Sequence, residues 1–267
     1  MKFVRRHLLT LFAILAFAYL LVPIGLVILF SFNDPAGRFN YTWQGFTLDH
    51  WRNWDGVPGL SEAMFLSLKI ALLASVVATA LGTLIALALV RYGFRGRSST
   101  NLLIFLPMAT PEIVLGASLL TLFINATSVF PLGFRTILIA HIMFCISYVV
   151  VTVKARLIGF DRSLEEAAMD LGANEWVTFR KVTLPLIAPA ILAGALLSFA
   201  LSIDDFVITY FNSGSEITFP LFVWGAARVG APPQVNVMGT MIFLVALSLM
   251  LLNVLWQRRR ESQVSGA

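Results

Sequence analysis

Two adjacent carboxylates, Asp204 and Asp205, stand in an otherwise apolar stretch at 187–211. A charged carboxylate in the middle of a membrane helix costs about 2.5–3.5 kcal/mol unless it faces water or a partner. The apolar stretches of the chain offer few basic partners beyond Lys69 and Arg135. This shortage favours a cationic ligand or a water-filled cavity over an internal ion pair. Since consecutive helical residues point about 100° apart, one aspartate could line a pathway while the other holds a neighbouring helix.

A third carboxylate, Glu112, follows two prolines in the sequence L-P-M-A-T-P-E. Pro107 and Pro111 should bend or break a helix at this point, which would leave Glu112 beside irregular backbone within the membrane. Broken helices that carry an ionisable residue are typical of transport pathways. A proline kink with Glu112 as a structural hydrogen-bonding group is an equally open interpretation.

The composition indicates a protein of the lipid bilayer. Of the 267 residues, 58% are hydrophobic and 12% are charged, and the mean hydropathy is +0.86, far from the values of a soluble domain. The apolar runs are continuous rather than alternating, which predicts helices rather than a β-barrel. Each run is near the roughly 20 residues that a helix needs to cross the hydrocarbon core. We therefore expect an all-α polytopic membrane protein, a single transmembrane domain over 1–267, with spans at about 8–32, 64–91, 101–124, 134–153, 187–211 and 235–256.

Six spans place both termini on the same side, and the basic residues indicate which side. They follow or precede alternate spans, as the positive-inside rule requires of cytoplasmic loops, so the net charge of +5 is a topology signal and not a sign of nucleic-acid binding. The first run continues from Leu8 to Phe32, too long for a signal peptide, and we expect an uncleaved first helix. The basic residues are Lys2, Arg5, Arg6, Arg91, Arg95, Arg97, Lys154, Arg156, Arg162, Arg180, Lys181, Arg258, Arg259 and Arg260.

Other polar and aromatic features carry weaker signals. The single Cys145 excludes an internal disulfide, and we interpret it as a packing residue, with no metal-ligand cluster in view. The aromatic-rich segment between the first two spans is interpreted first as an interfacial belt and second as a platform for a partner or ligand. Residues 217–227 are apolar but too short to span, which predicts a re-entrant or interfacial element. Trp224 and Arg228 in this region could form part of a gate or could anchor and pack the element. Asn125-Ala126-Thr127 matches a glycosylation acceptor, a pattern too short to carry weight.

One charge-dense segment interrupts this apolar chain, D-R-S-L-E-E-A-A-M-D-L-G-A-N-E-W-V-T-F-R-K-V-T-L-P at 161–185, hereafter the polar segment. Ser163 and Glu166 have the spacing of a capping box, and Gly172 stands where a helix would end in a left-handed residue. Asn174 can cap a second short helix, which Pro185 should limit. The predicted local structure is helix, glycine turn, helix, and its location predicts a contact surface outside the membrane.

The residues Glu166-Ala167-Ala168, Gly172, Val182 and Leu184-Pro185 resemble the EAA motif, E-A-A-x3-G-x9-[IV]-x-L-P, of permease subunits in bacterial binding-protein-dependent ABC importers. Further stretches resemble the permeases of spermidine/putrescine systems over nearly the whole chain. These stretches are S31-F-N33, W43-Q-G-F46, R91-Y-G-F-R-G96, H141-I-M-F-C145, E165-E-A-A-M-D-L-G-A173 and L201-S-I-D-D205.

The resemblance implies the six-helix architecture of type I (MetI-like) importer permeases in the bacterial inner membrane, with both termini in the cytoplasm. It implies no catalytic residue and no cofactor on this chain: ATP and Mg²⁺ would bind two separate ATPase subunits, and the other partners would be a homologous permease and a periplasmic or extracellular binding protein. The chain agrees in lacking a phosphate-binding G-x-x-x-x-G-K-[ST] loop. The implied substrate is a cation, a polyamine, which would meet Asp204, Asp205, Glu112, Tyr210 and Trp224. The ATPase contact would use Ser163, Glu165, Glu166, Ala167, Ala168, Asp170, Gly172, Leu184 and Pro185.

Two other classes remain open from the residues alone. A proton-coupled secondary transporter could use the same carboxylates as a proton relay, which would make the motif in the polar segment accidental. A membrane scaffold without transport activity would need neither the carboxylates nor the motif in the polar segment. An importer permease for another cationic or small organic solute is the nearest alternative to a polyamine permease.

Overall fold

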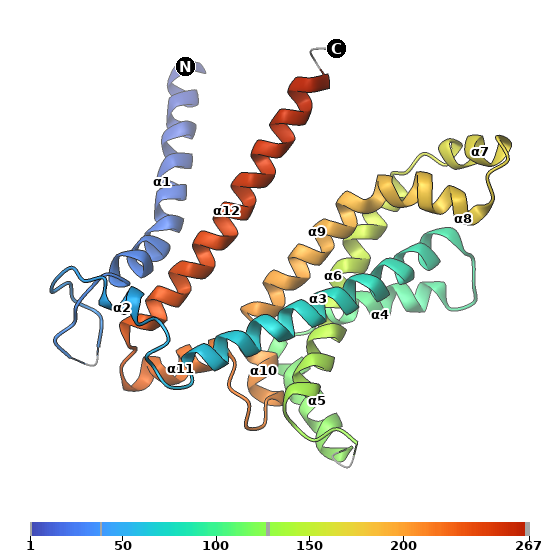
Figure 1. The fold of residues 1–267 in the computed structure, drawn as a ribbon. Helices are drawn as coiled ribbons and strands as arrows, with labels where there is room; N and C mark the ends of the chain where they lie inside the picture. The colour runs from blue at the N-terminus through green and yellow to red at the C-terminus, as the bar shows by residue number, and fades with distance from the viewer. Residues whose placement is uncertain (1, 38, 127–128, 265–267) are drawn as a thin grey trace. The chain divides into compact units, whose positions relative to one another are not determined.

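The computed structural model describes residues 2–37, 39–126 and 129–264, and in these ranges the chain is helical apart from loops and one isolated antiparallel bridge between Asn33 and Phe46 (Figure 1). The chain forms two compact units, one of residues 62–222 and one of residues 1–61 with 223–267. The prediction of one permease domain stays a prediction.

The larger unit is built around α6 (Phe134–Ile158) and α9 (Leu184–Ile203), which pack along each other (Figure 1). α3 (Leu60–Arg91) also approaches α6 closely: a Cβ added at Gly82 would lie 2.7 Å from Val149 Cβ. On the α9 side, the same addition at Gly194 would lie 3.5 Å from Val149 Cα. Small residues let helix backbones approach where lipid gives no hydrophobic drive to association. Val149 is fully buried between these helices, and Cys145, one turn earlier, is a buried packing residue as expected.

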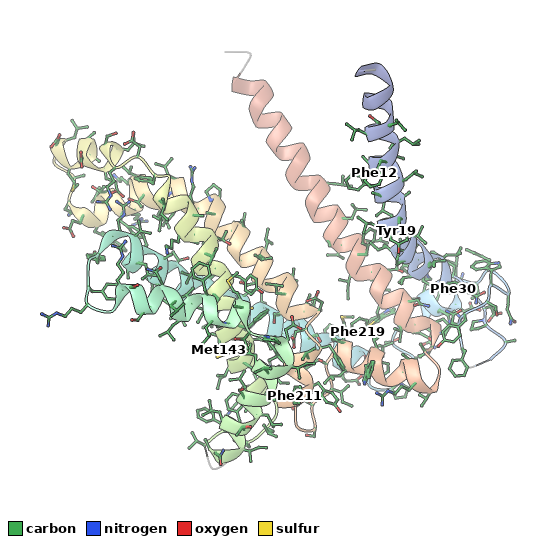
Figure 2. The ribbon with its side chains drawn as sticks, turned by 180° about the vertical axis from the view of Figure 1, so that it is seen from behind. Phe12, Tyr19, Phe30, Met143, Phe211 and Phe219 are labelled. Carbon is green, nitrogen blue, oxygen red and sulfur yellow. The ribbon has the colours of Figure 1, made fainter. Side chains whose placement is uncertain are left out.

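The smaller unit contains α1 (Lys2–Phe30), α2 (Asp49–Arg52) and α12 (Pro233–Val264), with α1 packed against α12. Phe12 and Tyr19 project from α1 (Figure 2) and are 72% and 78% exposed. Because the apolar window of this helix is not buried within the chain, its surface is available to lipid or to another subunit.

The aromatic-rich segment after α1 is a folded loop. Asn33 is fully buried and organises it: the side-chain amide donates to Asn40 Oδ1 at 2.6 Å and to the Thr42 carbonyl at 2.9 Å. The ring of Phe32 stacks on Phe46 and on Trp51, with centroids 5.6 and 5.2 Å apart. These rings therefore pack partly on one another, and the choice between an interfacial belt and a partner platform stays open.

Within the described residues, four helices are long and apolar enough to cross a membrane, and each overlaps a span predicted from the sequence. These are Leu8–Phe30, Leu60–Arg91, Phe134–Ile158 and Glu175–Ile203. The last predicted span lies within α12, whose described apolar part is the shorter stretch Pro233–Ser248. The count of six spans and the cytoplasmic location of both termini stay predictions.

The third predicted span is bent. α4 (Arg97–Ala109) and α5 (Glu112–Asn125) meet at an angle of 109°. The break falls at Thr110, whose extended backbone (φ −80°, ψ 132°) is what a residue before proline adopts, and Pro111 precedes the first turn of α5. The predicted break is thus confirmed at Pro111. Pro107, which was expected to contribute, lies inside α4.

The short apolar region at 217–227 forms α11 (Phe219–Val229), a helix of 11 residues. The prediction of an element too short to span is confirmed. The acceptor pattern at 125–127 includes Thr127, which lies outside the described residues.

Candidate functional site

The fifth predicted span is not one helix through both aspartates. α9 ends at Ile203, and α10 (Val207–Asn212) begins after an interruption at 204–206. The physical reason is the side chain of Asp205. Its Oδ2 accepts from the backbone N–H of Thr209 at 2.8 Å and from the Thr209 hydroxyl at 2.8 Å, and Oδ1 accepts from the N–H of Ile208 at 3.4 Å. Aspartate is favoured beside a helix start because it satisfies N–H groups that lack intrahelical partners.

His141 of α6 is the basic partner that the sequence reasoning missed. Its Nε2 lies 3.3 Å from Asp205 Oδ2 and 2.9 Å from the hydroxyl oxygen of Thr209, and its Nδ1 lies 2.7 Å from the hydroxyl oxygen of Ser202. The His141 and Asp205 side chains are 3% and 6% exposed. The expected shortage of basic partners was therefore wrong for Asp205. Lys69, one of the two cations considered, lies over the Phe134 ring at 4.8 Å. A histidine in an apolar run was the available signal, because ionisable residues in membrane spans usually face a partner.

Asp204 has a different environment from its neighbour. It occupies the C-terminal end of α9 and its side chain is exposed, while Asp205 is buried against His141. The structure thus separates the two carboxylates into one that is accessible and one that joins helices. The sequence had left open whether one aspartate faces a pathway while the other holds a neighbouring helix, and in the structure Asp205 is the one that holds the helices.

The remaining candidate pathway residues lie on three helices. Glu112 is exposed in the first turn of α5, which packs against α10, and Tyr210 of α10 is 58% exposed with its ring 5.6 Å from that of Phe206. Trp224 lies on α11, where the Arg228 guanidinium stands 4.4 Å over its ring. The structure brings α5 and α10 together and places Trp224 in the other compact unit.

α10 is held by a second buried amide. Asn212 Nδ2 donates to the Gly116 carbonyl of α5 at 3.3 Å and to the Ile208 carbonyl at 2.8 Å, and the Asn212 carbonyl accepts from Thr136 Oγ1 of α6 at 2.7 Å. Phe211, labelled in Figure 2, lies so close to Gly116 that an added Cβ there would be 2.8 Å from its ring. The short helix is therefore fixed to α5 and α6 at one end, and to α6 through His141 at the other.

The polar segment has the predicted order of elements. α7 (Ser163–Asp170) ends before Gly172, whose φ is +88°, and α8 (Glu175–Thr178) follows. The Asn174 side chain accepts from the Val177 N–H at 2.9 Å, which confirms the predicted cap. Positive φ disfavours residues with a Cβ, so the turn between the two short helices depends on glycine.

The capping box predicted from Ser163 and Glu166 is wrong. Ser163 is the first residue of α7, and its N–H donates to Asp161 Oδ1 at 3.0 Å, so Asp161 supplies the acceptor two residues earlier. This hydrogen bond holds the pKa of the Asp161 carboxyl below its usual range. The Glu166 N–H donates to the Arg162 carbonyl at 3.1 Å instead.

Pro185 does not end the second helix of the polar segment, contrary to prediction. A π-helical stretch, Phe179–Thr183, joins α8 to α9, and Pro185 lies exposed in the first turn of α9 beside the half-buried Leu184. Proline has no N–H to donate to the regular i→i−4 ladder, and a π-helical stretch directly before it is the kind of local change in hydrogen bonding that accommodates this gap. Glu175–Ile203 is consequently one long apolar span of 29 residues that starts in the polar segment.

Glu165 fastens α7 to the rest of the unit. Arg91 Nη1 lies 2.5 Å from Glu165 Oε2, and Arg91 Nη2 donates to Glu165 Oε1 at 2.6 Å. The Thr183 hydroxyl also donates to this carboxylate. Arg91 ends α3 and its guanidinium lies 5.3 Å from the Phe160 ring centroid. A planar guanidinium paired in this bidentate way fixes orientation as well as charge. The carboxylate expected to contact a partner is therefore engaged within this chain.

Most other predicted contact residues of the polar segment are accessible. Glu166, Ala167, Asp170 and Gly172 are exposed and Ala168 is half-buried. Apolar side chains are also accessible here, since Leu171 is 89% and Trp176 is 67% exposed. A cavity of about 540 Å³ adjoins this surface. Its lining comprises Leu87, Arg91, Tyr92, Glu165, Met169, Glu175, Trp176, Thr178, Phe179 and Thr183.

Comparison with known proteins gives relatives over nearly the whole chain. The spermidine/putrescine transport system permease protein PotC of Haemophilus influenzae is 39% identical over 251 residues, covering 94% of this chain and 96% of the relative. PotC of Escherichia coli K12 is 40% identical over 251 residues, with 94% of each chain covered. The putrescine transport system permease protein PotI of Escherichia coli K12 is 39% identical over 235 residues, covering 86% of this chain and 83% of the relative.

Solved structures show the same fold at low identity. A bacterial ABC transporter involved in import of the acidic polysaccharide alginate matches with a TM-score of 0.65 and 20% identity, over 96% of this chain and 95% of that one. An amino acid ABC transporter with histidines matches with a TM-score of 0.60 and 18% identity, over 80% of this chain and 100% of that one. The family model for binding-protein-dependent transport system inner membrane components matches residues 78–262. With its apolar spanning helices, this chain therefore belongs to the family of binding-protein-dependent transport system inner membrane components.

Proposed function

We propose that this chain is the permease subunit of an ATP-driven importer for polyamines. The relatives that share about 40% identity with it carry the names of spermidine/putrescine and putrescine permeases. A polyamine is a flexible organic polycation, so its passage through an apolar protein requires carboxylates or aromatic faces to compensate its charge. Asp204 offers an accessible carboxylate at an interrupted helix, the kind of site where transporters bind charged cargo.

The observation that carries this proposal is the continuity of one helix between two polar sites. Glu175–Ile203 begins in the polar segment and ends at Asp204. At 1.5 Å per residue it is about 44 Å long. A displacement of the polar segment would therefore reach the interruption at 204–206 through a rigid element, without a loop in between.

The polar segment is the proposed contact for a separate ATPase. Its accessible acidic side chains, Glu166 and Asp170, can receive basic donors of a partner, and exposed Leu171 and Trp176 can be buried by one. The adjoining cavity could receive a partner side chain. The Arg91–Glu165 pair supports this role because a contact segment can transmit force only if it is fixed to the helices behind it.

The complete importer would contain two ATPase subunits that bind ATP and Mg²⁺, a second homologous permease and an external solute-binding protein. This chain would carry no cofactor and perform no hydrolysis. ATP-driven closure of the ATPases would move the polar segment and switch the pathway from inward-facing to outward-facing. The binding protein would then release the cation toward Asp204, where attraction must stay modest to permit release.

Reconstitution of the full assembly in proteoliposomes tests the function. With the binding protein on the outside and ATP available to the ATPases, we expect accumulation of labelled spermidine or putrescine. Removal of ATP or of the binding protein should abolish it. Uptake that persists without ATP and follows an imposed proton gradient would instead establish a secondary transporter. ATP-dependent uptake of another solute alone would retain the importer and overturn the polyamine assignment.

A further inference from the structure

The ring of His141 connects three elements at the interruption between α9 and α10. From α6, Nδ1 faces Ser202 in the last turn of α9, while Nε2 faces Thr209 in α10 and Asp205 in the interruption itself. We propose that His141 is a positioning residue for the cargo: with Asp205 it fixes the interrupted backbone so that Asp204 alone presents its carboxylate to the polyamine. This inference deepens the proposed function and rests on it.

Asp205 is unsuited to meet cargo directly. Its Oδ2 already has three partners, which are the N–H and hydroxyl of Thr209 and the imidazole of His141, and its side chain is 6% exposed. A cation that reached this oxygen would have to displace hydrogen bonds that define the start of α10. Loss of such bonds leaves buried N–H and ring groups without acceptors, which is costly.

Asp204 meets the opposite conditions. It follows the last residue of α9, its backbone lies at φ −97° and ψ −2°, and its side chain is exposed. Its position is set by the residues on either side of it, since Ser202 and Asp205 both contact His141. The imidazole therefore constrains the backbone on both sides of the carboxylate without contacting it.

α10 could not supply the same constraint by itself. Its other anchors, Asn212 to Gly116 and Thr136 to Asn212, act at its far end. His141 acts at the near end, where α9 stops. Without the imidazole, Ser202 and Asp205 would lose their common partner, and the direction of the Asp204 side chain would no longer be fixed relative to α6.

The distribution of cysteine makes the proposal testable by thiol labelling. Cys145, the only cysteine, is buried one turn from His141 with its sulfur 3.5 Å from the Ser198 carbonyl. A Cys145→Ala chain in the complete importer provides the background and also a matched control on the same helix. We expect that background to retain wild-type uptake and an unchanged KM.

In this background, Asp204→Cys and Asp205→Cys are compared with a small cationic thiol reagent. We expect the thiol at position 204 to react at least tenfold faster than that at 205. Addition of His141→Gln to Asp204→Cys should change the labelling rate at least threefold. In chains that keep Asp204, His141→Gln should raise the KM for spermidine about tenfold, and Asp205→Asn should do the same.

Equal labelling at both positions, or a wild-type KM in His141→Gln and Asp205→Asn, would overturn the proposal. If His141→Gln fails to assemble, the same measurements on Asp205→Asn test the proposal, because this variant alters the His141–Asp205 pair at its other member. Absence of spermidine and putrescine uptake in the background chain would overturn the function, whereas the difference in labelling between 204 and 205 and its dependence on His141 are measured without cargo.

Discussion

Arg91 at the end of α3 binds both carboxylate oxygens of Glu165 in α7, with nitrogen to oxygen distances of 2.5 and 2.6 Å. The Thr183 hydroxyl, just before α9, donates to the same carboxylate. One side chain of the polar segment thus ties α7 to the end of α3 and to the π-helical stretch before α9. The segment proposed to contact the ATPase is held by an ion pair that is itself largely withdrawn from solvent.

Removal of this pair should loosen the polar segment. Arg91→Ala leaves the Glu165 carboxylate without its cation. We expect the free energy of unfolding to fall by about 3 kcal/mol. This is the lower end of the range for breaking a buried ion pair, because the two side chains are 18% and 14% exposed. Limited proteolysis at 159–175 of the assembled protein should become faster, and ATP-driven uptake should fall. Arg91→Lys keeps the charge but not the bidentate geometry, so its effect should be intermediate. Unchanged proteolysis in Arg91→Ala would contradict the anchoring role.

Gly172 should be sensitive to substitution for conformational reasons alone. Its φ is +88° and a Cβ would meet nothing within 4 Å, so a substitution introduces backbone strain without a clash. A left-handed conformation costs an L-residue about 1–2 kcal/mol, and valine should be worse than asparagine, which tolerates this region. We expect Gly172→Val to uncouple ATP hydrolysis from uptake and Gly172→Asn to retain most coupling.

Gly96 provides the matched control for that measurement. It also has a positive φ, +90°, and an added Cβ would meet nothing within 4 Å, but it lies before α4 and outside the polar segment. Gly96→Val should carry similar local strain while the ratio of uptake to hydrolysis stays closer to that of the parent chain. Equal uncoupling by the two valine variants would assign the effect to general destabilisation.

The charge of Asp204 should matter for uptake. Asp204→Asn preserves size but removes the negative charge, and an interaction with a charged group is worth about 1.5–3 kcal/mol, so uptake at low polyamine concentration should fall at least tenfold. Initial uptake rates over a range of spermidine concentrations would measure this change as a raised KM. Asp55→Asn, a substitution of an exposed aspartate in the loop before α3, is the control. Equal uptake by both variants would remove Asp204 from the pathway.

Gly82 should be intolerant of even one methyl group. A Cβ there would lie 2.7 Å from Cβ and Cγ1 of Val149, which is buried between helices. Overpacking of this kind costs about 1–3 kcal/mol, so Gly82→Ala should lower the unfolding temperature of the purified assembly. Gly25→Ala in α1 is the control, because nothing lies within 4 Å of its added Cβ. A smaller effect at Gly82 than at Gly25 would contradict the close packing of α3 on α6.

The sequence by itself determined the features that depend on near neighbours along the chain. Continuous apolar runs predicted the long helices, since burial of backbone polar groups in lipid requires helical hydrogen bonding. Pro111 predicted a break because it restricts the residue before it, and Gly172 predicted a turn because it alone accepts positive φ without strain. The spacing of Glu166, Gly172 and Pro185 identified the resemblance to importer permeases.

Only the tertiary structure decided which polar groups meet. His141 and Arg91 are far along the chain from Asp205 and Glu165, and helix periodicity gives no information on such pairs. The packing of α6 against α9 brings the imidazole to the interruption, so that one aspartate is buried and its neighbour remains accessible. The π-helical stretch Phe179–Thr183 likewise depends on context, because nothing in the local sequence predicted that the helix would continue past Pro185. Local chemistry therefore fixed the elements, and long-range packing assigned their side chains to separate roles.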